Sequence, residues 1–369
     1  MLAALALPGL ATTSTALADS APEKASLAVK YLDYRDSQPG ADRIHVTSPA
    51  LELVLPIAGN WSLQANTVSD SISGASPRYH SAISSASHFD EQRRATDVSV
   101  TRYFSRGSVN LGAGRSGEND YVSRYYSAQA TLATEDNNTT FLFGTSFAND
   151  DINPVNKIVK NERKHSNEFM FGITQVMSPV DLAQIVLTHI RGRGYFSDPY
   201  KSLDRRPRER DENIMLLRWN HHFTSNGNTL RLSYRYYSNS YGVNSHSVEK
   251  EYVVPFGDGW KFTPSARFYT QSAAGFYYDP VYDTRFKAPF PVGYKFGSTD
   301  DISADHRLSA FGALTLGFKL EKQITADWSA DLKLEMYQQR GSWRLLGTGS
   351  PGLANFSARS VQLGLKKTW

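Results

Sequence analysis

The chain of 369 residues contains no cysteine. It therefore has no disulfide, no thiolate zinc site and no cysteine-held haem or iron–sulfur cluster. It also lacks any apolar run of the roughly 18 residues that a membrane-spanning helix requires, and its mean hydropathy is −0.44. Glycine-rich phosphate loops and dinucleotide fingerprints are missing as well. The net charge of +4, from 40 basic and 36 acidic residues, gives no indication of a nucleic-acid partner.

Aromatic residues, in contrast, are plentiful. They make up 12% of the chain, with 20 Tyr, 19 Phe and 6 Trp. A polar average combined with many aromatics is typical of a transmembrane β-barrel, whose strands present alternate residues to lipid and to water.

The first residues predict export. Residues 1–18 are apolar and small and end in Ala16-Leu17-Ala18, an A-x-A cleavage pattern. The basic stretch that normally precedes such an apolar core is missing, so we expect residues 1–18 to be a signal peptide truncated at its N-terminus. The mature domain is then residues 19–369.

From Ser26 onward the sequence alternates between apolar and polar residues in about sixteen segments. Short turns rich in Gly, Asn, Asp and Pro are predicted at residues 57–60, 105–107, 136–138, 177–179, 224–228, 256–259 and 324–327. Between them lie mostly longer polar links at residues 36–43, 70–93, 116–121, 150–163, 195–209, 240–245, 275–302 and 341–355. Short turns at one end and long loops at the other are typical of outer-membrane barrels. We therefore predict an all-β fold, a single antiparallel transmembrane β-barrel of about sixteen strands, with fourteen as the alternative.

The two faces of each strand identify candidate lumen residues. In residues 230–236, for example, Leu and Tyr occupy the even positions, whereas Arg231 and Arg235 share the other face. A charge on the lipid face near mid-depth costs roughly 2–4 kcal/mol, so charged side chains should face inward. The predicted lumen-lining residues are Arg218, Arg231, Arg235, Lys261, Arg267, Asp331, Lys333 and Glu335, and we expect Glu168 to join them. Their mixed charge is compatible with weak ion selectivity or with a salt-bridged network that closes the barrel, and the sequence leaves both open.

The last strand ends on an aromatic residue. Val361, Leu363, Leu365 and Trp369 follow a period of two. A final strand of this kind resembles the closing strand of outer-membrane barrels, in which the terminal aromatic is read by the barrel-assembly machinery. Trp369 is therefore the predicted assembly signal.

Three stretches of the chain resemble a known family. They are residues 70–77 (DSISGASP), residues 117–123 (GENDYVS) and residues 234–242 (YRYYSNSYG), the last followed by Ser245-His246-Ser247. In this order they resemble a bacterial family of unknown function that is regarded as outer-membrane β-barrels. The resemblance implies no reaction, cofactor or catalytic residue. It does imply a periplasmic redox protein or a lipoprotein as a possible partner.

Several polar clusters are weaker candidates for a site. His80, His88 and Asp90 carry groups that could bind a divalent metal, although their spacing matches no metal motif. The acidic residues of the segment 279–305 could hold calcium. The basic run Arg205–Arg210 suggests contact with anionic lipid or lipopolysaccharide. No catalytic residue and no cofactor is predicted.

The sequence thus favours an outer-membrane channel or envelope scaffold over an enzyme, and it leaves an enzymatic role open. The alternative is an outer-membrane hydrolase with a site at the extracellular rim around His80 and His88.

Overall fold

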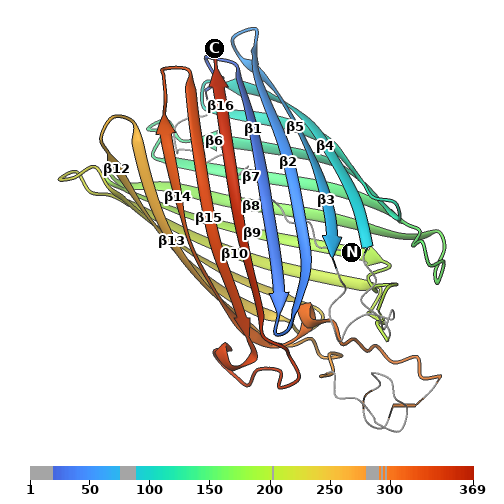
Figure 1. Ribbon diagram of the computed structural model, residues 1–369. Helices are drawn as coiled ribbons and strands as arrows, with labels where there is room; N and C mark the ends of the chain where they lie inside the picture. Colours follow the sequence, from blue (N-terminus) through green and yellow to red (C-terminus); the bar gives the residue numbers. More distant parts are fainter. Residues whose placement is uncertain (1–19, 75–88, 202, 280–290, 292–293, 296) are drawn as a thin grey trace.

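The computed structural model describes residues 20–74, 89–201, 203–279, 291, 294–295 and 297–369. These residues form sixteen antiparallel strands that close into one barrel (Figure 1). The predicted fold and its preferred strand count are confirmed, and the alternative of fourteen strands is wrong. The predicted signal peptide lies outside the described residues.

The elements follow one another with short interruptions. The first eight strands are β1 Ser26–Gln38, β2 Ala41–Ile57, β3 Trp61–Gly74, β4 Phe89–Phe104, β5 Gly107–Gly117, β6 Tyr121–Ala133, β7 Thr139–Ile152 and β8 Glu162–Ser178. The second eight are β9 Asp181–Gly194, β10 Glu209–His222, β11 Thr229–Asn239, β12 Asn244–Phe256, β13 Trp260–Gln271, β14 Phe311–Gln323, β15 Trp328–Arg340 and β16 Phe356–Thr368. Two short 3₁₀ helices, η1 His306–Leu308 and η2 Gly341–Trp343, lie in the loops that follow β13 and β15.

Each strand pairs with its neighbours in the sequence, and β1 closes the ring against β16. Ser26 lies opposite Thr368 in this closing pair. Beyond it, Ala25 and Trp369 exchange both backbone hydrogen bonds at 3.0 Å. Closure leaves no open sheet edge, which in lipid would expose unsatisfied N–H and C=O groups at several kcal/mol each.

The two ends of the barrel carry different connections. Seven short turns lie at the end where β1 begins and β16 ends, the longest being residues 223–228. The other eight connections lie at the opposite end and include residues 153–161, 195–208, 272–310 and 341–355. This alternation is the predicted one. The predicted link 36–43 is wrong, because β1 and β2 stay paired as far as Gln38 and Ala41 and leave a turn of residues 39–40.

Among the described residues, no helix has the length and apolar character needed to cross a membrane.

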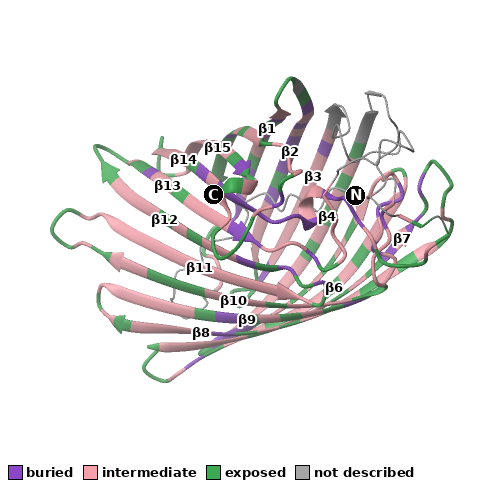
Figure 2. Cartoon of the chain, turned by 90° about the horizontal axis from the view of Figure 1, so that it is seen from below, coloured by how far each residue is buried: buried purple, intermediate pink, exposed green. Residues whose placement is uncertain are grey.

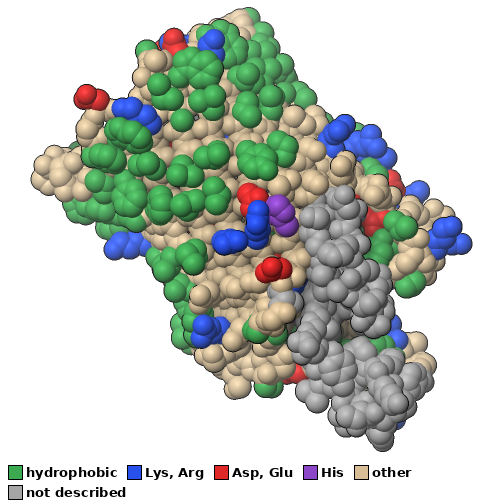
Figure 3. All heavy atoms as spheres, in the orientation of Figure 1, with side chains coloured by type: hydrophobic (Ala, Val, Ile, Leu, Met, Phe, Trp, Pro, Cys, Tyr) green, Lys and Arg blue, Asp and Glu red, His purple; other side chains and the backbone are tan. Residues whose placement is uncertain are grey.

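The wall of the barrel exposes apolar side chains outward. Figure 3, viewed from the side of β16, β1 and β2, shows them over the part of the wall near the C-terminal end, with a group of charged and His side chains beyond them. Near the short-turn end, each of three tryptophans lies under a cation: Arg102 is 5.0 Å from the Trp61 ring, Lys322 is 5.0 Å from Trp260, and Lys367 is 5.4 Å from Trp328. Aromatics and cations in this order are typical of a membrane interface.

Candidate functional site

The strand register assigns each side chain to one of two faces. In β10, Leu217 and Trp219 are 37% and 38% exposed and lie on the outer face, so Arg218 between them lies on the inner face. Residues directly opposite in an antiparallel pair share a face, so the assignment passes from strand to strand around the ring.

The register places all eight predicted lumen residues on the inner face. They come from β10, β11, β13 and β15 and are Arg218, Arg231, Arg235, Lys261, Arg267, Asp331, Lys333 and Glu335. Glu168 of β8 lies on the same face. Whether they line a conducting lumen stays a prediction.

Between β11 and β15 the inner face is densely charged but nearly neutral. Six basic residues, Arg231, Arg235, Lys261, Arg267, Lys319 and Lys333, face five acidic residues, Glu249, Glu251, Glu321, Asp331 and Glu335. We call these eleven residues the charged wall.

The charges of this wall are paired along and across the strands. Lys333 Nζ is 3.0 Å from Glu335 Oε1, and Lys319 Nζ is 3.0 Å from Glu321 Oε1. Lys319 and Lys333 lie directly opposite each other, an unfavourable arrangement for like charges that these carboxylates offset. Asp331 packs against Gly364, where any Cβ would clash with its carboxylate. Seven of the eleven residues therefore form partly buried ion pairs, namely Arg231, Glu251, Lys319, Glu321, Asp331, Lys333 and Glu335.

The neighbouring part of the inner face, on strands β7 to β10, carries an apolar row. Leu142, Gly172, Val186 and Leu216 lie side by side in register across β7, β8, β9 and β10. Met170 of β8 lies in the neighbouring row. Sequence reasoning missed this apolar wall, although its signal was present: residues 169–173 are apolar on both faces of β8.

At the long-loop end, Asp305 is the centre of a buried ion network. Its side chain is fully buried and lies 3.0 Å from Lys201 Nζ and 2.7 Å from Arg206 Nη2, and it also binds the guanidinium of Arg307. Asp198, 3.3 Å from Arg307 Nη2, and Asp204, 3.0 Å from Arg206 Nε, balance the remaining charge. We call these six residues the Asp305 latch, because they join the loop 195–208 to the loop 272–310.

The latch controls the ionisation of its central carboxyl group. Burial alone would raise the pKa of Asp305. The charges of Lys201 and Arg307 and the hydrogen bonds from Arg307 outweigh burial and hold this pKa well below its usual range. For the same reason the carboxylate of Asp305 raises the pKa of the Arg307 guanidinium against the effect of burial. Asp305 and Arg307 are therefore ionised near neutral pH.

Backbone contacts support the latch. Arg205 and Ile302 exchange backbone hydrogen bonds of 2.8 and 2.9 Å. Ser350 of the loop 341–355 does the same with Ala310, donating its N–H to the Ala310 carbonyl at 2.8 Å and accepting the Ala310 N–H on its Oγ at 2.9 Å. On the other side, Tyr200 accepts the Val155 N–H of the loop 153–161 at 3.0 Å. Four long loops are thus joined over one side of the mouth, and Figure 2, which looks onto this end, shows loop segments lying within the ring of strands.

A small apolar cluster lies beside the latch. Tyr241, Val243, Ala274 and Leu308 are buried together, and the Phe276 ring is 5.1 Å from that of Tyr241. The Tyr241 hydroxyl donates to the Pro207 carbonyl at 2.8 Å. The cluster therefore adds apolar contact to the ionic joint between the loops.

The structure bears differently on each of the weaker candidates for metal binding. His80 and His88 lie outside the described residues, and Asp90 pairs with Ser73 at the start of β4, with its side chain outside the described part. Among the described residues, no group of three or more His, Asp or Glu side chains could hold a metal ion. The calcium hypothesis is wrong for Asp305, because that carboxylate is already bound by three cations.

The basic run Arg205–Arg210 does not form one lipid-facing surface. Arg206 belongs to the latch, and Arg210 lies on the inner face with its guanidinium 5.0 Å from the Phe196 ring. Arg208 instead binds Glu162 at 2.6 Å. The run is divided because it leaves a loop and enters a strand, where alternate residues face opposite ways.

Comparisons with known proteins agree with the architecture. A family profile described as "Protein of unknown function (DUF3570)" matches residues 1–90 and 79–360. A search of curated proteins gave no match.

Solved structures share the fold. CdiB from Acinetobacter baumannii aligns with a TM-score of 0.50 at 9% identity, covering 92% of this chain and 60% of that one, so this chain spans about three fifths of its length. OccAB1 from the same organism aligns over 97% of this chain and 100% of that one, with a TM-score of 0.46 and 9% identity. A Pseudomonas aeruginosa FadL homologue aligns over 96% and 91%, with a TM-score of 0.43 and 11% identity. At such identities the likeness concerns the fold alone.

Proposed function

The chain belongs to the DUF3570 family of proteins of unknown function, and we propose that it is an outer-membrane channel that passes small polar solutes through a mixed-charge lumen. The observation that carries this proposal is the division of one closed barrel into an apolar outer face and an inner face that carries the charged wall. Sixteen strands enclose a lumen wide enough for water unless loops fill it.

The charge balance of the inner face argues for weak selectivity between ions. Six basic and five acidic residues alternate over β11 to β15, so neither sign dominates the potential. A cation and an anion would each find opposite charges along the same wall.

The apolar wall adds a second kind of surface to the same passage. Leu142, Val186 and Leu216 lie on strands β7 to β10, whereas the charged wall occupies β11 to β15. A solute with a charged end and an apolar part could contact both walls at once. This arrangement suits small polar solutes that also carry an apolar part.

A structural role in the envelope is the second candidate, and the mouth supports it. The Asp305 latch and the backbone ties of the loops 153–161, 195–208, 272–310 and 341–355 hold this end together. If the latched loops close the lumen, the barrel would act as a scaffold and pass no solute.

Liposome swelling separates the two candidates. Purified protein is reconstituted and challenged with zwitterionic, anionic and cationic amino acids and with a neutral sugar. A channel gives swelling with little dependence on solute charge. If protein that shows the heat-modifiable mobility of a folded barrel gives no swelling with any solute, even after the latch is removed by Asp305→Asn, the channel proposal is wrong.

A further inference from the structure

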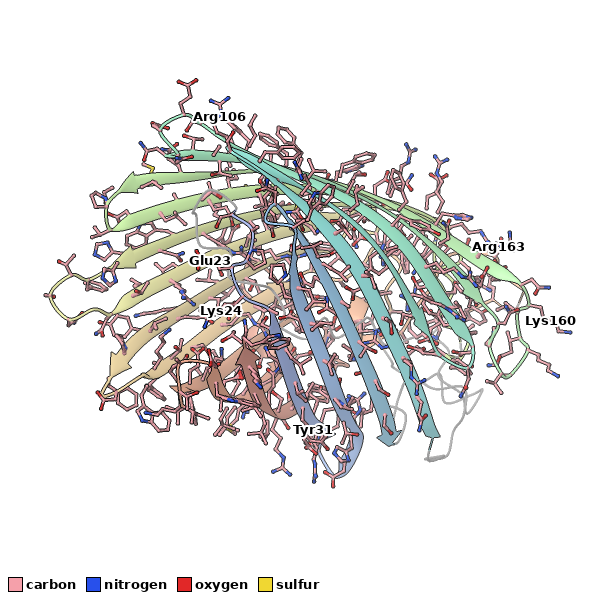
Figure 4. The ribbon with its side chains drawn as sticks, turned by 90° about the horizontal axis from the view of Figure 1, so that it is seen from above. Glu23, Lys24, Tyr31, Arg106, Lys160 and Arg163 are labelled. Atoms are coloured by element: carbon pink, nitrogen blue, oxygen red, sulfur yellow. The ribbon has the colours of Figure 1, made fainter. Side chains whose placement is uncertain are left out.

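Five arginines face outward along the long-loop rim of strands β5 to β9. Arg115 and Arg124 lie directly opposite each other on β5 and β6, and the same register row continues through Asn149 and His165 to Arg193 on β9. Two more arginines lie on the same face in the adjacent rows. Arg163 on β8 is one row nearer the long-loop end, and Arg191 on β9 is one row nearer the short-turn end. We call these five residues the arginine belt. Figure 4 shows Arg163 and its neighbour Lys160 pointing away from the barrel.

The belt lies where the apolar surface of the wall ends. Tyr126 and Phe147 occupy the next row toward the short-turn end, directly opposite each other, and are 61% and 45% exposed. Phe169, 54% exposed, lies one row further along the same face. Aromatic side chains gather at the level of lipid headgroups, so the guanidinium groups just beyond them lie at headgroup depth.

The acidic residues of this rim do not neutralise the belt. Asp151 is shared between Arg124 at 2.7 Å and Arg163 at 3.7 Å, while Asp211 and Glu209 lie 3.9 and 3.5 Å from Arg191 and Arg193. Five arginines therefore face three carboxylates, which leaves two positive charges in excess. Among the described residues, Arg115 has no acidic group within ion-pair distance.

The pairing of Arg115 with Arg124 points to an anion. Like charges directly opposite on neighbouring strands destabilise a sheet, and an anion between them would reverse the sign of that interaction. The planar guanidinium fork binds phosphate oxygens through two parallel hydrogen bonds. Contacts of 3.5 to 3.9 Å to the present carboxylates leave donors for such a ligand.

We propose that the arginine belt binds the phosphorylated headgroup of an outer-leaflet lipid such as lipopolysaccharide. Adjacent strands are about 4.8 Å apart, so Arg124 and Arg193, three strands apart, are separated by about 14 Å along the wall. A headgroup that carries phosphates on separate sugars can therefore reach both Arg124 and Arg193, with its acyl chains against Tyr126 and Phe147. This inference rests on the proposed outer-membrane location and is independent of conduction.

The test compares binding of three probes to the full chain in detergent. The probes are diphosphorylated lipid A, the same lipid after removal of its phosphates, and inorganic phosphate, with retained lipid counted by native mass spectrometry. The variant carries Arg115→Gln, Arg124→Gln and Arg193→Gln. The matched control is Arg106→Gln, an arginine 48% exposed in the turn at the opposite end of the barrel.

Wild type and the control should bind diphosphorylated lipid A equally, and the triple variant should bind it about a hundredfold more weakly. The dephosphorylated lipid should bind wild type as weakly as the intact lipid binds the variant, and inorganic phosphate should not compete. If the triple variant fails to fold, Arg115→Gln alone should weaken binding about fivefold.

Equal binding by wild type and variant, or equal binding of both lipids, would overturn the proposal. So would competition by inorganic phosphate, which would show a site for a free anion. A change of oligomeric state in the variant with lipid binding intact would assign the belt to a contact between copies of the chain. Liposome swelling should be the same in wild type and variant, because the belt faces away from the lumen, so the lipid site and the channel can fail separately.

Discussion

Replacing Asp305 by asparagine removes the anion on which three cations of the mouth converge. The substitution keeps the size of the side chain and cancels its charge, so Lys201, Arg206 and Arg307 are left close together around a buried neutral side chain. The loops 195–208 and 272–310 should then separate while the strands stay paired, because the latch lies outside the sheet.

The size of the effect follows from the burial of Asp305, whose side chain is 0% exposed. Breaking a buried ion pair by removing one partner costs about 3–5 kcal/mol. Asparagine still accepts a hydrogen bond, so the lower end of this range applies. Since 1.4 kcal/mol corresponds to a factor of ten, the population with open loops should rise by about a hundredfold.

Limited trypsin digestion of the folded barrel measures that population. Lys201 and Arg307 are cleavage sites held inside the latch, with side chains 11% and 34% exposed, whereas Lys157 and Lys160 are exposed in the loop 153–161 and serve as the internal standard. When opening is fast relative to cleavage, the cleavage rate follows the open fraction. Cleavage after Lys201 and Arg307 should accelerate about a hundredfold in Asp305→Asn, with cleavage at the standard sites unchanged.

Asp301→Asn is the matched control, because Asp301 lies in the same loop and is exposed. It should digest like wild type. If Asp305→Asn also digests like wild type, the latch does not hold the loops, and the reasoning from buried charge is refuted.

The remaining predictions concern pH, the lumen, the outer wall and assembly. Because the pKa of Asp305 is lowered, the latch stabilises the closed loops fully at pH values above the ordinary Asp pKa of about 4. This stabilisation is lost as the pH falls through the lowered pKa. If pepsin finds the loops fully open already at pH 4, this prediction is wrong. Lys333→Glu leaves the charged wall with five basic and six acidic residues, so the reversal potential in a salt gradient should shift toward cation preference. The control Lys24→Glu, at the short-turn rim, should leave the reversal potential unchanged. Leu363→Arg, at an outward position 52% exposed, should destabilise the barrel in vesicles by about 2–4 kcal/mol in urea titrations. An equal loss from Ser360→Arg, at a partly exposed inner position opposite Glu335, would refute the assignment of faces. Trp369→Ala should lower the amount of heat-modifiable barrel in the outer membrane more than it lowers the stability of barrel already folded, because the backbone hydrogen bonds to Ala25 remain; unchanged yield would remove Trp369 as an assembly signal.

The sequence predicts the barrel well, because a period of two is a local property. The alternation within one strand is enough to separate its two faces. Arg231 and Arg235 could therefore be assigned to one face and Leu230 and Tyr234 to the other without knowledge of the neighbouring strands. Turn residues mark where each strand ends. Even strand number and closure then follow from the need to satisfy every backbone group in lipid.

The mouth could not be predicted, because its contacts join residues distant in sequence. Arg206 and Asp305 are 99 residues apart, and neither belongs to a periodic segment. In the sequence Asp305 is one of several acidic residues in a polar loop, and this composition suggested a calcium-binding site. The structure shows that the charge of Asp305 is already balanced, because Lys201, Arg206 and Arg307 from two loops contact it.

The arginine belt illustrates a third case. Arg115, Arg124 and Arg193 each appear in the sequence as single charges at strand ends. Register aligns them into one row across five strands. The contiguous run Arg205–Arg210 was the more conspicuous basic feature, yet its side chains are dispersed to different surroundings.

The most direct test of the proposed function is the conductance of the purified protein in planar lipid bilayers, recorded for wild type and for Asp305→Asn. A channel with a nearly neutral charged wall should give discrete conductance steps with little preference between cations and anions, and release of the latched loops should make the open level larger or more frequent. Folded protein that inserts into the bilayer and gives no steps in either form would contradict the channel and leave a scaffold.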